Sequence, residues 1–216
     1  MNQGRDSWRR ALRGLRRRFR PTTIERRIAE LGLRRGDLAI DCGANVGDVS
    51  AALARTGAEV HAFEPNPHAY SVLVERLGRK RNVRLYPQAV LDRAGRTRLH
   101  LHVDAVVDPV GASVGSSLLA TKGNVDPDLY VEVETIDLAQ FVLELDRPVK
   151  VIKIDVEGVE CALVHHLLDT GAIERVDTVL VELHDRHIPE LQAENQLLRE
   201  RLTRDGLVDR VLTDWA

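Results

Sequence analysis

The stretch Asp41-Cys42-Gly43-Ala44-Asn45-Val46-Gly47 and the acid Glu64 are the residues whose types and spacing best suit ligand chemistry. A glycine turn between a strand and a helix lets backbone N–H groups approach a ligand closely. Glu64 follows Gly47 by 17 residues, near the place where nucleotide-binding α/β folds carry an acid for ribose hydroxyls. Together they predict a site for a molecule that contains a nucleoside.

The residue order in this turn differs from that of a phosphate-binding loop. A G-x-G-x-x-G loop places a pyrophosphate at a helix N-terminus, whereas an anionic Asp41 would repel phosphates and favour a cationic ligand. S-adenosylmethionine carries an ammonium group, a sulfonium centre and a ribose for Glu64, so we predict it as the ligand. An unrelated nucleotide site and a purely structural turn are the alternatives.

The surrounding elements place further polar groups beside this turn. Apolar strand-like runs alternate with helical patterns, which predicts an α/β fold with a mostly parallel sheet flanked by helices. Ligands bind such sheets at the carboxyl ends of the strands. The polar residues predicted at these ends are Asp41, Glu64, Gln88, Asp155 and His184.

Between Gln88 and residue 145 the pattern changes. Residues 89–91 and 97–103 flank the turn Asp92-Arg93-Ala94-Gly95, which predicts a β-hairpin. Residues 104–128 lack periodicity, and we expect a substrate-side loop. Residues 131–136 predict a short strand and residues 138–145 a helix. Gln88 and Ala89 either contact an adenine ring or mark an ordinary strand-to-loop transition.

Composition limits the class of protein. With 216 residues, 30% charged and 44% hydrophobic, the chain suits one globular domain. No apolar run reaches the roughly 18 residues of a membrane span, and the N-terminus lacks a secretory signal pattern, so we expect a cytoplasmic protein. Cys42 and Cys161 are too few for a disulfide framework.

The N-terminal residues 1–21 form a predicted basic arm, followed by a single domain over residues 22–216. Residues 1–36 contain 12 Arg and three acids, whereas the rest of the chain is acidic. Trp8, Leu12, Leu15 and Phe19 would form one apolar stripe if this arm were helical. It could contact a membrane surface or nucleic acid, pack on the domain, or remain loose. Thr22 and Glu25 then predict the start of a short helix that Gly32 ends.

Taken together, the motifs resemble the FkbM-type family of S-adenosylmethionine-dependent methyltransferases. The matching stretches are Asp41–Gly47, Phe63–Pro67, Gly115–Leu118, Val133–Asp137 and Lys153–Glu160. The resemblance implies a class I methyltransferase (Rossmann-like) fold, S-adenosylmethionine as cofactor, and methylation of a hydroxyl oxygen on a sugar, natural product or other small molecule.

The resemblance also implies roles for individual residues. The cofactor would be held by Asp41, Gly43, Asn45, Gly47 and Glu64, with Gln88 and Ala89 in the region that commonly contacts adenine. Asp155 and Glu157 would stand close to the methyl-transfer site. The chain departs from the usual fold in its shortened C-terminal strand region, where only residues 207–212 could form a strand. An exposed sheet edge there would allow a homodimer.

Methyl transfer to an alcohol also requires a proton acceptor. We predict Asp155 as the general base, then His184, with Glu157 orienting the acceptor. Asp155 could instead bind the cofactor or cap a helix, and Glu157 and Glu160 could be acids of a first helical turn. A metal site at His184, Asp185 and His187 is less favoured, because it lacks matched ligands elsewhere. An RNA methyltransferase and a non-catalytic module that uses the basic arm remain the rival functions.

Overall fold

The computed structural model describes residues 23–106, 109–111, 113, 125–183, 191–213 and 215. The chain divides into two units, residues 1–32 and 33–216. In the first unit the described element is the helix α2 (Thr23–Glu30), followed by Gly32 with φ +63°. This is the short helix expected from the sequence. The predicted basic arm lies outside the described residues, and its boundary at residue 21 stays a prediction.

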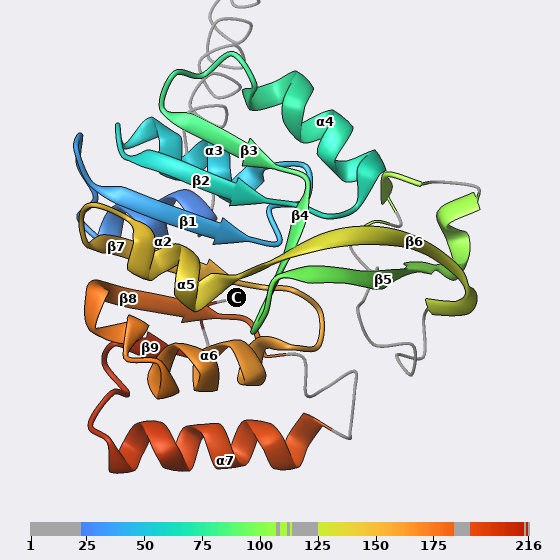
Figure 1. Ribbon diagram of the computed structural model, residues 1–216. Coiled ribbons are helices and arrows are strands. Elements are labelled where there is room, and N and C mark those ends of the chain that lie inside the picture. Colours follow the sequence, from blue (N-terminus) through green and yellow to red (C-terminus); the bar gives the residue numbers. More distant parts are fainter. Residues whose placement is uncertain are drawn as a thin grey trace, which may run out of the picture. The chain divides into compact units, whose positions relative to one another are not determined.

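The second unit is built on a six-stranded sheet with the order β3-β2-β1-β7-β8-β9 (Figure 1). Each pair of neighbouring strands is parallel. The strands are β1 (Leu38–Cys42), β2 (Glu59–Phe63), β3 (Val83–Tyr86), β7 (Val149–Ile154), β8 (Val176–Val181) and β9 (Val211–Leu212). This order confirms the predicted Rossmann-like sheet, and the two-residue β9 is its shortened C-terminal strand region.

The central strands are buried on both faces, which explains their almost continuous apolar sequences. All five residues of β1 are buried, as are five of the six residues of β7. Among the few polar side chains inside this sheet, the strand register places Lys153 of β7 directly beside Asp41 of β1. These two residues lie in the middle of the sheet, where unpaired charges would be costly.

Helices cover both faces of the sheet. The helices are α3 (Asp48–Arg55), α4 (Pro67–Leu77), α5 (Leu138–Glu144), α6 (Glu160–Asp169) and α7 (Leu191–Arg204). Figure 1 shows α5 and α6 on one face and α3 on the other. Two helices begin at side-chain caps, because Asn66 accepts the N–H of His68 at 2.9 Å and Asp137 accepts that of Gln140 at 2.9 Å.

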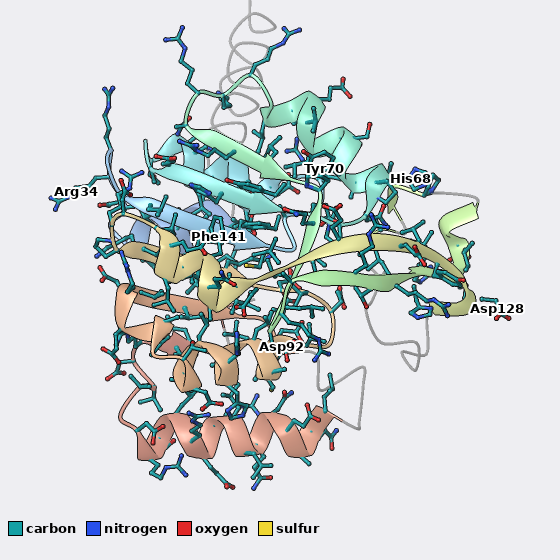
Figure 2. All side chains as sticks on the ribbon, viewed as in Figure 1. Arg34, His68, Tyr70, Asp92, Asp128 and Phe141 are labelled. Carbon is teal, nitrogen blue, oxygen red and sulfur yellow. The ribbon has the colours of Figure 1, made fainter. Side chains whose placement is uncertain are left out.

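An aromatic cluster fixes α5 against the sheet. Phe141, labelled in Figure 2, packs edge-on against Phe63 of β2 with ring centroids 5.2 Å apart. Tyr86 of β3 stacks on Phe63 at 4.5 Å and lies 2.9 Å from His61 Nδ1 through its hydroxyl oxygen. Burial lowers the pKa of His61, which suits a neutral ring in this apolar layer.

A second, three-stranded sheet has the order β4-β6-β5, with β4 (Gln88–Leu91), β5 (Gly95–His102) and β6 (Val125–Asp137). The predicted hairpin between residues 89–91 and 97–103 is therefore wrong. β6 lies between the two strands, parallel to β4 and antiparallel to β5. The Thr135 hydroxyl donates to the Arg93 carbonyl at 3.0 Å, so β6 also supports the turn that was expected to close the hairpin.

The segment expected as a substrate-side loop is partly structured. The short 3-10 helix η1 (Val103–Val106) follows β5, and β6 begins at Val125. Pairing of Val125 with His102 of β5 supplies the partner that the local sequence does not reveal. Most of residues 107–124 lie outside the described residues, so a role in acceptor choice stays a prediction. Among the described helices, none is long and apolar enough to cross a membrane.

Candidate functional site

A cavity of about 250 Å³ lies at the carboxyl ends of β1, β2 and β7, where the second sheet meets the first. The turn after β1 lines it from Gly43 to Val46, and Glu64 lines it after β2. Gln88, Ala89 and Leu99 contribute from the second sheet. This is the position at which open α/β sheets bind their ligands.

Two glycines of the turn are required by its geometry. Gly43 has φ +79°, and a Cβ there would lie 1.8 Å from the backbone oxygen of Asp155. Gly47 has φ +92°, and its Cβ would lie 2.6 Å from Leu73 Cδ1 on α4. Gly43 therefore lets the turn after β1 approach the residue that follows β7, and Gly47 lets α3 begin close to α4.

Asn45 adopts the left-handed conformation, with φ +47°. Its Oδ1 accepts the N–H of Val46 at 2.7 Å, which stabilises this backbone geometry. Its Nδ2 donates to Ser113 Oγ at 3.2 Å, and that hydroxyl donates to the Val110 carbonyl at 2.7 Å. Ser113 lines the cavity and was missed, because nothing in the local sequence distinguishes it from other residues of the expected loop.

Glu64 is 6% exposed and faces the turn. Its carboxylate accepts the N–H of Asn45 at 2.7 Å and the N–H of Asn66 at 2.8 Å. Burial raises the pKa of Glu64 to about 7, although these two N–H groups and the Lys153 ammonium oppose the shift. Each carboxylate oxygen has a second lone pair, so Glu64 can still accept hydroxyl donors from a ligand in the cavity.

Asp41 lies behind the cavity wall. It is fully buried and absent from the cavity lining. Its Oδ2 accepts the Ser50 hydroxyl of α3 at 2.5 Å, and its Oδ1 lies 3.4 Å from Lys153 Nζ. Direct contact of Asp41 with the cofactor stays a prediction. The geometry favours an indirect role through Lys153.

Lys153 is a functional candidate that was not predicted from the sequence. Its ammonium lies 2.8 Å from the Gly43 carbonyl oxygen and 3.0 Å from Asp155 Oδ2. Burial alone would lower the pKa of Lys153, but the carboxylates of Asp41 and Asp155 outweigh it and raise that pKa. A lysine in the apolar run of β7, one residue before the strand ends, was the signal in the sequence.

The segment after β7 presents Asp155 and Glu157 to the cavity. Glu157 has φ +62°, an uncommon conformation for a residue other than glycine. Glu160 is 2% exposed, and its carboxylate accepts the N–H groups of Val156 and Gly158 at 3.0–3.1 Å. Glu160 is therefore a first-turn acid of α6, whereas Glu157 precedes this helix and lines the cavity.

The remaining predicted site residues divide into two groups. Gln88 and Ala89 line the cavity from β4, where the Gln88 side-chain amide lies 3.4 Å from Glu134 Oε2. His184, Asp185 and His187 lie outside the described residues, so their catalytic and metal-binding roles stay predictions. Within the described part of the chain, no three His, Cys, Asp or Glu residues are grouped to hold a metal ion.

The charges around the cavity favour a cationic ligand. Four carboxylates belong to its described lining, those of Asp48, Glu64, Asp155 and Glu157, against the one lysine, Lys153. That lysine already contacts two acids, and Asp48 pairs with Arg76 at 2.7 Å. The acidic lining as a whole suits a ligand with positive charge and hydroxyl groups, while Phe63, Pro65 and Leu99 offer an apolar wall.

Comparison with known proteins gives two matches in sequence. The family model described as the methyltransferase FkbM domain matches residues 41–207. The hexuronic acid methyltransferase AglP of Haloferax volcanii is 30% identical in an alignment of 178 positions, which covers 78% of this chain and 67% of that protein.

Solved structures give more distant matches. A precorrin-6y C5,15-methyltransferase from Geobacter metallireducens is 14% identical and has a TM-score of 0.44, over 82% of this chain and 69% of that one. An rRNA methylase from Streptococcus thermophilus is 12% identical and has a TM-score of 0.43, over 83% and 75%. Both TM-scores are below 0.5, so neither likeness bears on the function.

Proposed function

The chain belongs to the methyltransferase FkbM family, and from this premise we propose that it methylates a hydroxyl oxygen of a sugar or another small molecule with S-adenosylmethionine as donor. The observation that supports the proposal is the cavity at the carboxyl ends of the strands. Its described lining contains several acids and one lysine, Lys153, which already pairs with Asp155. The name of the relative AglP refers to a hexuronic acid, which supports a sugar as acceptor.

The residues of the cavity fit this donor. When bound, S-adenosylmethionine supplies a methyl group on a sulfonium centre. Glu64 would accept the ribose hydroxyls, and the turn from Gly43 to Val46 would offer backbone groups to the amino acid end. Ala89 and Gln88 would lie along the adenine, and the apolar wall would exclude water. The described lining can therefore hold both the charged and the apolar parts of the cofactor.

The acceptor would lie near Asp155 and Glu157. Much of the rate enhancement in methyl transfer comes from holding the acceptor oxygen in line with the methyl group. Asp155 would accept the proton that the hydroxyl loses, and Glu157 would orient the acceptor by a hydrogen bond. Both carboxyl groups belong to the segment directly after β7, so they can address one acceptor together.

A two-stage experiment tests this function. Calorimetric titration with S-adenosylmethionine comes first, followed by an assay for S-adenosylhomocysteine with glucuronic acid, galacturonic acid, glucose and galactose as acceptors. We expect binding of the donor and product formation with at least one sugar. Failure to bind the donor would overturn the proposal. Product formation only with RNA, lost when residues 1–20 are deleted, would favour the RNA methyltransferase alternative.

A further inference from the structure

Lys153 is a buried cation that has no assigned role in the proposed reaction. It is 3% exposed and stands between Asp41 of β1 and Leu180 of β8 in the strand register. Burying an ammonium in the middle of a sheet is costly unless its charge and its N–H donors are satisfied. Since Lys153 also lines the cavity, its partners connect the interior of the sheet with the site.

The ammonium of Lys153 contacts three parts of the molecule. The Gly43 carbonyl oxygen at 2.8 Å belongs to the turn after β1, and Asp155 Oδ2 at 3.0 Å follows β7. Asp41 Oδ1, at 3.4 Å, lies inside β1. That oxygen is buried and has no hydrogen-bond partner among the described residues, so the lysine supplies its nearest compensating charge.

The two carboxylates that contact Lys153 differ in their exposure. Asp41 is fully enclosed and fixed by Ser50, whereas the Asp155 side chain is 25% exposed at the cavity. The buried acid therefore holds the ammonium in place, and the ammonium in turn contacts the acid that faces the cavity. A carboxylate at a partly open position can rotate into several orientations, and a fixed cation beside it selects one of them.

We propose that Lys153 is a positioning residue for methyl transfer, which holds the Asp155 carboxylate at the cavity wall while Asp41 serves as its buried counter-ion. The inference rests on the proposed function, in which Asp155 faces the acceptor hydroxyl. It gives Asp41 a role different from contact with the cofactor. It also connects the cofactor turn to the acceptor side, because the same ammonium binds the Gly43 carbonyl.

The test must separate this role from a need for charge balance in the fold. Lys153→Met alone leaves two acids without their cation and is expected to lose stability. The double variant Lys153→Met/Asp41→Asn removes the cation together with its buried counter-ion, and so restores the balance while Asp155 stays. Lys150→Met is the matched control, because Lys150 belongs to the same strand but pairs with Asp177 at 2.8 Å on the surface.

Three readouts are measured on the full chain: affinity for S-adenosylmethionine by calorimetry, turnover with the sugar that the wild type methylates fastest, and a crystal structure of the double variant. We expect the double variant to fold and to bind the donor, with turnover lower by about 10- to 100-fold because the acid is misplaced. A fall in turnover without a loss of donor affinity separates a positioning role from a general disturbance of the site. Lys153→Arg, which keeps a cation beside Asp155, should recover part of the turnover.

Each outcome decides the proposal. A displaced Asp155 carboxylate in the crystal structure, with reduced turnover and Lys150→Met unchanged, would support it. An unmoved Asp155, or wild-type turnover in the double variant, would overturn it. Failure of the double variant to fold would assign Lys153 to the fold and also overturn it. If the wild type binds no donor or methylates none of the sugars, the proposed function fails, while the crystal structure still tests the position of Asp155.

Discussion

The neighbouring strands β1 and β2 each bring a buried acid to the same edge of the sheet, but the two acids have different surroundings. Asp41 contacts the Ser50 hydroxyl and the Lys153 ammonium. Glu64 accepts two backbone N–H groups, and among the described residues no cation lies within 4.0 Å of it. Burial raises the pKa of Glu64 to about 7.

This difference explains how two acids at the carboxyl ends of neighbouring strands can have different roles, one in stability and turnover and the other in ligand binding. A buried acid that is matched by a cation and a hydroxyl has little to gain from a ligand. An acid that is held only by N–H groups still gains from ligand hydroxyls or from a positive charge. The β1 and β7 side, with Asp41, Lys153 and Asp155, is therefore expected to affect turnover and stability, and the β2 side, with Glu64, to affect affinity for the cofactor.

The largest expected effect tests the β7 side. Asp155→Asn should lower turnover by about two to four orders of magnitude if Asp155 is the general base, because an amide does not accept the hydroxyl proton. Affinity for S-adenosylmethionine should change little. Steady-state kinetics and calorimetry measure the two effects separately, and Asp177→Asn on the surface of β8 is the control. Unchanged turnover would remove Asp155 from this role.

The β2 side should respond in the opposite way. Glu64→Gln should weaken binding of S-adenosylmethionine by about 10- to 100-fold, as expected when hydrogen bonds to a charged group are lost. Turnover at saturating donor should fall much less than in Asp155→Asn. Calorimetry at pH 8, where the Glu64 carboxyl is mostly ionised, measures the affinity. A larger loss in turnover than in affinity would contradict the separation of the two sides.

The same variant has a second signature in the pH dependence of stability. The folded-state pKa of Glu64, about 7, lies above the ordinary value of 4.5, so the folded protein binds this proton more tightly than the unfolded chain. Wild-type stability from this group is therefore present below pH 4.5 and is lost as the pH rises through 7. As the pH rises from 4.5 to 8, the free energy of unfolding of Glu64→Gln, measured with urea, should increase relative to that of the wild type by up to about 3 kcal/mol. A difference in unfolding free energy between the two proteins that stays constant over this pH range would contradict the raised pKa of Glu64.

The sequence predicted the parts of this site that depend on local pattern. The parallel strands, the glycine turn and helix α5 followed from apolar runs, from Gly43 and Gly47, and from the helical pattern of residues 138–145. Their geometry is set within a few residues, so the local sequence contains the information. The position of Glu64 after β2 was predictable for the same reason.

The failures concern contacts between residues distant in sequence. The insertion of β6 between β4 and β5 is a pairing that neither neighbouring segment encodes, and the turn at Asp92 favoured the simpler hairpin. The ion-pair partner of Asp41 was not predicted either, because Lys153 lies beside it only through the pairing of β1 with β7. Contact of Asp41 with the cofactor stays a prediction.

The smallest expected effect concerns the environment of Asp41. Ser50 is fully buried, and its hydroxyl donates to Asp41 Oδ2 at 2.5 Å. Ser50→Ala should lower the free energy of unfolding by about 1–3 kcal/mol, because a buried carboxylate oxygen loses its donor. Ser71→Ala, at an exposed position of α4, should have almost no effect. Urea unfolding of both variants measures the difference.

Cofactor affinity in Ser50→Ala then distinguishes the two acids. If the charge of Asp41 is compensated by the buried Lys153, the loss of the Ser50 hydroxyl should destabilise the fold while S-adenosylmethionine still binds with nearly wild-type affinity. If Asp41 instead binds the cofactor, the variant should lose affinity as Glu64→Gln does, because the orientation of that carboxylate depends on Ser50. A loss of affinity comparable to that of Glu64→Gln would therefore place both strand-end acids in the binding site and remove the contrast between them.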